Sequence, residues 1–276
     1  MFLFRKVAII GVGFIGGSLA LAMKKNRICR EVVGVSKHKR TIILALSRKA
    51  IDKGSLSLDI IRGSDLVILS TPVSSIMHLK NEVLRYVDRE CIITDVGSTK
   101  ESVFLALSKV FPNYIGSHPL AGSEKKGIAN ASSGIFKGSL CLLTLAKGRS
   151  TVAFNKVKEM WRRIGARVVT LSPKEHDKKL GFASHLPHAV AYALINSIPN
   201  NALKFAAGGL KDTTRISASD PGMWNDIFMT NRDNLLDAIC SFEDSLKRIK
   251  SAIKSNDKRI LIKILSQSKK KRESLK

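Results

Sequence analysis

The residues of this chain that are best suited to chemistry lie in two short stretches, far apart in the sequence. The first is a glycine-rich turn, in which Gly11, Gly13 and Gly16 form the pattern GxGxxG directly after an apolar run. The second, Ser117-His118-Pro119-Leu120-Ala121-Gly122-Ser123-Glu124, offers an imidazole. A GxGxxG turn between a strand and a helix binds the pyrophosphate of a dinucleotide, and a histidine accepts a proton near neutral pH. Together they predict an oxidation in which the dinucleotide takes a hydride while His118 takes a proton.

Each glycine of the turn has its own expected role. Gly11 allows the tight turn, Gly13 lets the backbone approach the pyrophosphate, and Gly16 lets the helix pack closely on the strand. The N-terminus of the following helix directs free N–H groups and the positive end of its dipole at the phosphates. With two residues that follow a later strand, the predicted cofactor-binding residues of this edge are Gly11, Gly13, Phe14, Ile15, Gly16, Thr71 and Pro72.

The end of the second predicted strand favours NADP over NAD. An NAD site usually has an acid there that binds the ribose 2′-hydroxyl, whereas this chain has Ser36, Lys37, Lys39 and Arg40. Hydroxyl and basic side chains bind a 2′-phosphate, and one charge-assisted hydrogen bond contributes about 1.5–3 kcal/mol. NAD stays the alternative, because solvated basic side chains are also expected in a very basic protein.

The elements that would position these residues alternate between strands and helices over residues 1–171. Continuous apolar runs, typical of strands buried on both faces, occur at 6–10, 31–35, 65–70, 91–95, 139–145 and 167–171. Helical composition lies between them at 14–25, 75–87, 100–109 and 150–164. The alternation predicts an α/β fold with a Rossmann-type doubly wound parallel sheet and leaves His118 in a loop at its carboxyl edge.

Helices replace strands after Ser172-Pro173. Residues 175–198 and 221–265 have helical composition, and apolar residues within 231–256 recur at heptad-like steps of four and three. These seam positions are Leu235, Ile239, Phe242, Leu246, Ile249 and Ile253. A seam this long packs against its own domain and a second subunit, so we predict a homodimer. The predicted domains are a dinucleotide-binding domain at 1–171 and an all-α substrate and dimerisation domain at 172–276.

Motifs along the whole chain resemble those of the prephenate/arogenate dehydrogenase family. The matching stretches occur in order, at 11–16, 95–100, 118–122 with Glu124, 184–188, 211–216 and 219–224. The resemblance implies a Rossmann-type domain followed by a helical dimerisation domain. It also implies an NAD(P)-dependent oxidative decarboxylation of prephenate or arogenate in tyrosine biosynthesis. In that reaction ring carbon C4 is oxidised and the ring carboxylate leaves as carbon dioxide.

The resemblance assigns the reacting and anchoring roles to three residues. It implies that His118 is the base at the substrate 4-hydroxyl and that Ser98 helps to orient the histidine. An alternative role for Ser98 is the N-cap of a helix that begins at Thr99. The resemblance also implies that Arg215 binds a substrate carboxylate, for which a planar guanidinium suits better than an ammonium.

Five further residues match the family's substrate pocket. The resemblance places Ser184 and His188 along the substrate side chain and Glu124 at the pocket mouth, with His185 and Trp224 as further substrate-binding candidates. The alternatives are a buried helix histidine for His185, a core residue for Trp224 and a solvated acid for Glu124. No metal site is predicted.

The side chain of the substrate stays open between the pyruvyl group of prephenate and the amino group of arogenate, with a lean toward prephenate or both. No chorismate mutase segment is expected before the first strand, and no regulatory domain after the helices. A rival β-hydroxyacid-dehydrogenase-like enzyme would use a lysine base where this chain has His185 and His188. A non-enzymatic Rossmann binding module would have no use for His118, Ser98 and Arg215 together.

The composition fits a globular enzyme of two modest domains. The chain has 276 residues, 44% of them hydrophobic, and no apolar run approaches the roughly 20 residues of a membrane span. The net charge of +25 is compatible with a nucleic-acid partner, but its lysines are spread along the chain with few aromatics between them, so neither nucleic acid nor membrane is expected. Cys29, Cys91, Cys141 and Cys240 lack metal-ligand spacing and are predicted to be buried small hydrophobes of a cytoplasmic protein.

Overall fold

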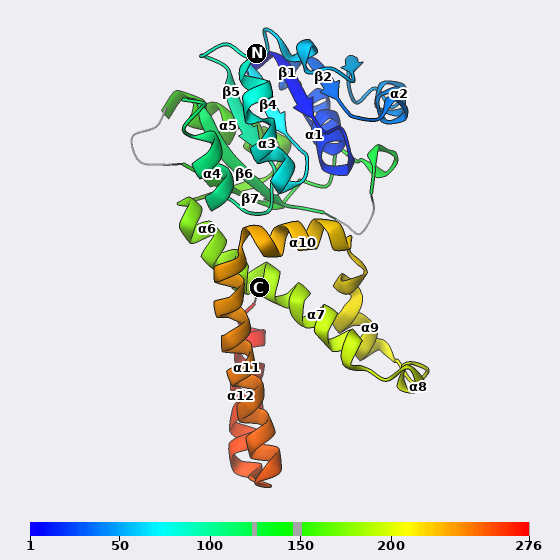
Figure 1. Ribbon diagram of the computed structural model, residues 1–276, viewed down its shortest axis with the longest axis vertical. Helices are drawn as coiled ribbons and strands as arrows, with labels where there is room; N and C mark the ends of the chain where they lie inside the picture. The colour runs from blue at the N-terminus through cyan, green and yellow to red at the C-terminus, as the bar shows by residue number, and fades with distance from the viewer. Residues whose placement is uncertain (123–125, 146–150, 276) are drawn as a thin grey trace.

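The computed structural model describes residues 1–122, 126–145 and 151–275 (Figure 1). An eight-stranded sheet has the strand order β3-β2-β1-β4-β5-β6-β7-β8. Its strands are β1 (Phe4–Ile10), β2 (Cys29–Val35), β3 (Lys53–Ser55), β4 (Leu66–Leu69), β5 (Ile92–Asp95), β6 (Tyr114–Leu120), β7 (Leu140–Thr144) and β8 (Arg167–Leu171). Neighbouring strands are parallel from β3 to β6, β6 and β7 are antiparallel, and β7 and β8 are parallel. The order from β3 to β6 is that of doubly wound dinucleotide-binding sheets.

Helices cover both faces of the sheet and create two separate cores. They are α1 (Phe14–Lys25), α2 (Lys39–Ser47), α3 (Val73–Leu84), α4 (Glu101–Leu107) and α5 (Thr151–Ile164), with the short turns η1 (Leu58–Ile61) and η2 (Ile128–Asn130). Ile9 packs in the core that contains Trp161 of α5, and the next residue, Ile10, packs in the core that contains Phe104 of α4. Successive strand residues point to opposite faces, so the predicted Rossmann-type fold is confirmed.

The strand β6 corrects the prediction that His118 lies in a loop. His118 lies within β6, pairs with Leu142 of the antiparallel strand β7, and is buried. The sequence YIGSHPL places glycine, serine, histidine and proline where a buried strand usually has aliphatic residues, so no apolar run reveals it. A strand holds the backbone of His118 in place through its neighbours on the sheet.

The chain after Ser172 is helical, as predicted from the change of pattern there, and this segment is called the helical half below. Its elements are α6 (Pro173–Leu180), η3 (Gly181–His185), α7 (Leu186–Ser197), α8 (Asn200–Leu203), α9 (Gly208–Thr214), η4 (Arg215–Ala218), α10 (Pro221–Thr230), α11 (Arg232–Lys254) and α12 (Lys258–Glu273). As far as residue 275, this half contains no strand. Figure 1 shows α11 and α12 side by side as an arm that points away from the sheet, while α10 packs on α3. None of the helices in the described ranges could cross a bilayer.

A π-helical turn, η3, interrupts the helix predicted over 175–198. Pro187 follows this turn at the start of α7. Proline lacks an N–H, and its ring collides with the carbonyl four residues earlier in a regular α-helix. The wider π turn relieves that collision, and such turns are frequent at functional sites. Ser184 and His185 lie in the turn itself, and His188 lies just beyond it.

The heptad-like seam on α11 is covered by its own chain only at the N-terminal end. Leu235 is buried, whereas Leu246 is 53% exposed and Ile253 is 62% exposed. Large apolar side chains are also exposed on α12, at Ile260 and Ile262. Exposed large apolar side chains on two helices that contact each other are what a protein interface would cover.

One cysteine departs from the predicted burial. Cys29, Cys91 and Cys141 are buried, but Cys240 is exposed, and all four are free thiols. Cys240 follows the seam residue Ile239 on α11, which turns its side chain away from the packed face.

Candidate active site

The glycine-rich turn lies at the carboxyl edge of the sheet, between β1 and α1. Gly11 has φ +99°, and a Cβ there would lie 2.3 Å from the carbonyl oxygen of Ser70. A Cβ at Gly16 would lie 2.1 Å from the carbonyl oxygen of Gly11, so only glycine permits this contact between helix and turn. A Cβ at Gly13 would meet no atom within 4 Å. Gly11 and Gly16 therefore shape the turn, and Gly13 leaves room above it for a phosphate group.

The start of α1 and the loop after β4 contain hydrogen-bond donors without a partner among the described residues, close to the space above Gly13. Gly13 is the N-cap of α1 and provides no side-chain cap, so the first N–H groups of the helix stay available to an anion. Thr71 Oγ1 is buried without a hydrogen-bond partner in the described part of the chain, and Pro72 caps α3. Both features fit the pyrophosphate and nicotinamide end of a dinucleotide.

The loop after β2 presents basic side chains and no acid. Ser36 Oγ accepts a hydrogen bond from the backbone N–H of His38 at 3.2 Å. Lys37, Lys39 and Arg40 are exposed around it. These groups stand where a dinucleotide fold places the ribose 2′ position.

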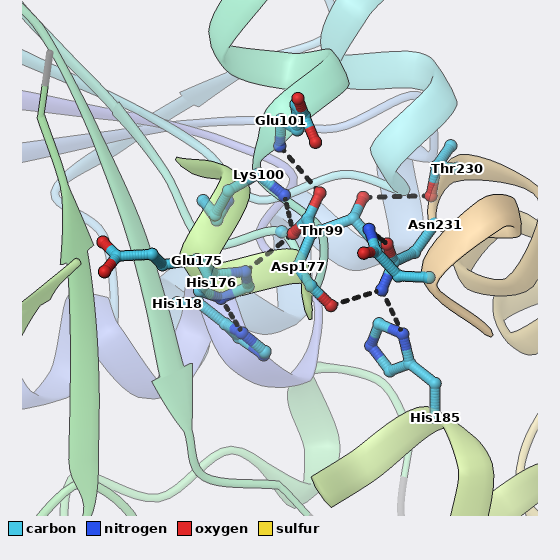
Figure 2. A network of polar contacts seen from close by, with 12 residues as sticks. Thr99, Lys100, Glu101, His118, Glu175, His176, Asp177, His185, Thr230 and Asn231 are labelled. Atoms are coloured by element: carbon cyan, nitrogen blue, oxygen red, sulfur yellow. Dashed lines mark hydrogen bonds and ion pairs between the residues drawn. The ribbon is translucent and has the colours of Figure 1, made fainter. Parts of the chain in front are cut away.

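Three side chains form a buried chain of hydrogen bonds that begins at His118 (Figure 2). His118 Nδ1 lies 2.9 Å from Nε2 of His176, and His176 Nδ1 lies 2.7 Å from Oδ1 of Asp177. His118 is 7% exposed, whereas His176 and Asp177 are almost completely buried. The chain connects strand β6 of the sheet to helix α6 of the helical half, and it engages one of the two ring nitrogens of His118.

Asp177 also caps helix α4 of the α/β half. Its Oδ1 accepts the backbone N–H of Lys100 at 2.8 Å, and its Oδ2 accepts that of Glu101, also at 2.8 Å. These are N–H groups at the helix start, which favours a negative charge. The alternative reading of Ser98 as the N-cap is therefore wrong, because α4 begins at Glu101 and its free N–H groups are bonded to a carboxylate from another helix. Ser98 is half-buried beside this helix start.

A buried ion pair lies under the same helix start. Lys100 Nζ contacts Asp95 Oδ2, and neither side chain is exposed. Asp95 also accepts hydrogen bonds from the Tyr114 hydroxyl at 2.7 Å and from the Gly97 N–H at 2.9 Å. Because every oxygen of Asp95 is bonded, the buried carboxylate is stabilised and Lys100 stays in place beside the histidines.

The surroundings hold the imidazoles of this cluster neutral. Burial, followed by the neighbouring His176 and Lys100, lowers the pKa of His118 well below its usual value of 6.5. Burial and Lys100 lower the pKa of His176 to about 2. A neutral imidazole is the form that can accept a proton from a substrate hydroxyl.

The helical half contributes a second, more open group of side chains. The rings of His188 and Trp224 are stacked, with centroids 3.5 Å apart and an interplanar angle of 21°. His188 Nδ1 lies 3.0 Å from the carbonyl oxygen of Ser184, which makes this nitrogen the donor and leaves Nε2 as an acceptor. Burial, with a contribution from the charge of Arg215, lowers the pKa of His188. Arg215 itself is exposed, at the start of η4.

His185 is a buried histidine, as its structural alternative proposed. Its Nδ1 accepts a hydrogen bond from the Asn231 amide at 2.9 Å, and Asn231 also donates to the backbone carbonyl of Asp177 at 2.9 Å. Burial lowers the pKa of His185 to about 4. Its Nε2 and Trp224 Nε1 are both buried without a hydrogen-bond partner among the described residues. Glu124 lies outside the described residues.

Residues 19–170 match the family model described as "Prephenate dehydrogenase, nucleotide-binding domain", and residues 172–267 match "Prephenate dehydrogenase, dimerization domain". The chain belongs to the prephenate dehydrogenase family. The first match begins after the glycine-rich turn, so the evidence for that turn is its own geometry.

Two relatives named as dehydrogenases align with almost the whole chain. A cyclohexadienyl dehydrogenase of Zymomonas mobilis is 33% identical over 289 residues, covering 100% of this chain and 98% of that protein. A prephenate dehydrogenase of Bacillus subtilis is 32% identical over 280 residues, covering 98% of this chain and 76% of that protein. The solved structure of prephenate dehydrogenase from Aquifex aeolicus, in complex with hydroxyphenyl propionate and NAD+, has a TM-score of 0.94 and 33% identity, covering 99% and 98% of the two chains.

Membership of the prephenate dehydrogenase family makes the chain an NAD(P)-dependent dehydrogenase. It confirms the resemblance read from the motifs, and it removes the hydroxyacid-dehydrogenase and binding-module interpretations. The nucleotide-binding domain and the glycine turn agree on a dinucleotide, and they leave the choice between NAD and NADP open.

Sequence reasoning found His118 but not the residues that support it. His176 and Asp177 lie 58 and 59 positions along the chain from His118, and no spacing rule connects them. A usable signal exists in retrospect, since an adjacent histidine and aspartate occur just before the motif 184–188. Lys100 was part of a matching motif, but its complete burial against Asp95 could not be read from the sequence.

Proposed function

We propose that this family member oxidises and decarboxylates prephenate, arogenate or both, with His118 as the base. One observation carries this proposal. His118 lies on β6, at the edge of the sheet where the dinucleotide turn lies, as a neutral ring with Nδ1 engaged by the protein. Its Nε2 makes no hydrogen bond within the described ranges and is the nitrogen available to a substrate hydroxyl.

The proposed reaction balances without any further reactant. The nicotinamide cofactor supplies the acceptor for the hydride of ring carbon C4. His118 takes the proton of the 4-hydroxyl as that hydride leaves. When the bond to the ring carboxylate breaks, its electron pair enters the ring, carbon dioxide departs, and His118 returns the proton to the phenolic oxygen.

The helical side of the site would hold the substrate rather than react with it. Arg215 provides a guanidinium for one carboxylate, and His188 lies against Trp224 nearby. The N–H groups of His185 Nε2 and Trp224 Nε1, which are buried without a partner among the described residues, favour an anionic or carbonyl-bearing ligand. Ser184 supports His188 through its carbonyl oxygen, and Ser98 is proposed to orient the hydroxyl from the opposite side.

For the cofactor, we infer a preference for NADP. The support is the exposed basic group of Lys37, Lys39 and Arg40 around Ser36, with no acid at the end of β2. A 2′-phosphate would gain charge-assisted hydrogen bonds there, while the 2′-hydroxyl of NAD would lack its usual carboxylate partner. The comparison of kcat/KM for the two cofactors tests this, and a clear preference for NAD would contradict it.

We further infer a homodimer formed through the helical half, which we delimit as 172–276 after a dinucleotide-binding domain at 1–171. The exposed apolar residues of α11 and α12 support this, because they would otherwise face water. Light scattering on the purified chain measures the mass directly. A monomer at micromolar concentration would contradict the inference.

The activity itself is tested by following the absorbance of the reduced nicotinamide. Prephenate and arogenate are each assayed with NAD and with NADP. Turnover of at least one substrate supports the proposed function, and the ratio of the two kcat/KM values assigns the substrate side chain. If neither substrate is turned over by folded protein, the proposed function is wrong.

A further inference from the structure

We propose that His176 and Asp177 are positioning residues that hold His118 in the one tautomer able to take the substrate's proton. The proposal rests on the proposed function of His118 as the base. It concerns two side chains from α6, of which His176 contacts His118 and Asp177 contacts His176 (Figure 2).

The direction of each hydrogen bond follows from the carboxylate at the end of the chain. Both oxygens of Asp177 already accept backbone N–H groups at the start of α4, and an ionised carboxylate can only accept. The Nδ1 of His176, at 2.7 Å from Oδ1, must therefore carry the hydrogen. In a neutral imidazole the other nitrogen is then an acceptor, so His176 Nε2 accepts from His118 Nδ1 across 2.9 Å.

His118 is thereby left with a lone pair on Nε2. The opposite tautomer would place a hydrogen there and two facing lone pairs between His118 and His176. Asp177 and His176 are at most about 1% exposed. Bulk water therefore cannot reach the groups that would lose their partners if the directions of these hydrogen bonds were reversed. The carboxylate thus selects the tautomer of a ring that it does not touch.

The hydrogen bond between His118 and His176 is also compatible with the state that follows proton uptake. A protonated His118 keeps its Nδ1 hydrogen bond to His176, and the negative charge of Asp177 lies at the far side of that ring. In serine proteases a carboxylate in contact with the catalytic histidine has this function, and its replacement by an amide lowers kcat about 10⁴-fold. Here an additional histidine is inserted between the two groups.

Two nearly isosteric variants separate positioning from structural support. In His176→Gln the amide oxygen can occupy the place of Nε2 and still accept from His118. In His176→Asn the amide reaches only the place of Nδ1, so Asp177 keeps a partner and His118 loses its own. Each variant removes one ring and keeps one polar contact, which makes them matched controls for stability.

We expect His176→Gln to keep kcat within about tenfold of the wild type and His176→Asn to lose about 10²–10³-fold, the range for a misplaced acid–base group. The Kd of the cofactor should be unchanged in both, and their Tm values should agree. Equal kcat values for the two variants, per folded protein, would show that His176 is only structural and would overturn the proposal.

The tautomers can also be read without any turnover. Long-range ¹H–¹⁵N spectra of the wild-type protein at neutral pH should show His118 and His176 protonated at Nδ1 and not at Nε2. A His118 ring protonated at Nε2 would overturn the proposal. Because this measurement needs no substrate, it decides on the tautomer even if prephenate and arogenate both fail as substrates, which would refute only the proposed function.

Discussion

The two sides of the site differ in how deeply their side chains are buried and in how completely they are hydrogen-bonded. On the side of His118, the β6 histidine and the α6 residues His176 and Asp177 behind it are buried, and the ring nitrogens that face the protein have partners at 2.7–2.9 Å. On the helical side, Arg215 is exposed and His188 is half-buried, with its ring held mainly by stacking on Trp224. The fixed side suits a proton transfer, for which small displacements are costly. The open side suits the capture of a substrate from water.

The two sides are nevertheless connected by helix α6 and the π turn that follows it. Asp177 caps α4 of the sheet side, and Asn231 bonds both the Asp177 carbonyl and His185. Asp226 of α10 accepts the N–H of Ser74 at the start of α3, at 3.0 Å. Carboxylates of the helical half thus bond the beginnings of two sheet-side helices and attach that half to the sheet.

The largest effect is expected where the fixed side loses its base. In His118→Asn the side chain can still reach His176, but no nitrogen lone pair remains for the substrate. We expect kcat to fall about 10²–10⁴-fold, the usual contribution of a placed base. The Kd of the cofactor, measured by titration, should hardly change because the glycine turn is intact. Turnover at the wild-type rate would exclude His118 from the mechanism.

A smaller and different effect is expected where the open side loses its anchor. Removing the guanidinium in Arg215→Ala deletes a charge-assisted hydrogen bond of about 1.5–3 kcal/mol, which corresponds to a KM about 10- to 100-fold higher. Because the interaction is made in the ground state as well, kcat should change little. Arg215→Lys is the control. Its KM should lie between those of the wild type and of Arg215→Ala, since an ammonium keeps the charge but cannot form the planar, two-bond pair of a guanidinium with a carboxylate. An unchanged KM would contradict the anchoring role.

The cofactor loop provides a test that changes neither side of the substrate site. In Ser36→Asp the new carboxylate can bind a ribose 2′-hydroxyl and repels a 2′-phosphate. The ratio of kcat/KM for NADP over NAD should fall by about tenfold or more. Arg40→Gln should lower the use of NADP alone and leave that of NAD unchanged. If the ratio is the same in Ser36→Asp and wild type, the 2′ position lies elsewhere.

The fold was predictable wherever strands are buried on both faces. The runs at 6–10, 65–70 and 91–95 correspond within two residues at either end to β1, β4 and β5, because a central parallel strand is necessarily apolar. β3 has only three residues, Lys53–Ser55, and none is apolar. β6 contains Pro119 and His118, so its pairing with β5 and β7 became visible only in three dimensions.

The candidate site was predictable where one motif contains the whole function, as in the glycine turn. It was not predictable where function depends on contact between distant segments. The adjacent histidine and aspartate at 176–177 mark polar side chains close to the motif 184–188, but they do not indicate that His176 would meet His118 or that Asp177 would cap α4. The heptad-like seam was visible in the sequence, but only the exposure of Leu246 and Ile253 shows how much of it the chain leaves uncovered.

The smallest expected effect is on the pH dependence of the unfolding free energy, to which buried and exposed histidines contribute differently. His176 and His185 have pKa values of about 2 and about 4 in the folded protein, lowered chiefly by burial, against about 6.5 in an unfolded chain. The unfolded state therefore binds more protons below pH 6.5, so stability present above that pH is lost as the pH falls. Lys100 and His185 oppose protonation of His176. For His185, His188 opposes protonation and Asp177 favours it.

Each of these histidines should cost about 1 kcal/mol of unfolding free energy between about pH 7 and about pH 5.5, measured by urea denaturation. His176→Gln removes one titrating ring, so its loss over the same interval should be smaller than that of the wild type by about that amount. His78→Gln removes a histidine that is exposed on α3 and should leave the wild-type loss unchanged. An identical loss in His176→Gln and wild type would mean that the pKa of His176 is the same in the folded and the unfolded protein, against the lowering that burial and the nearby charge of Lys100 cause.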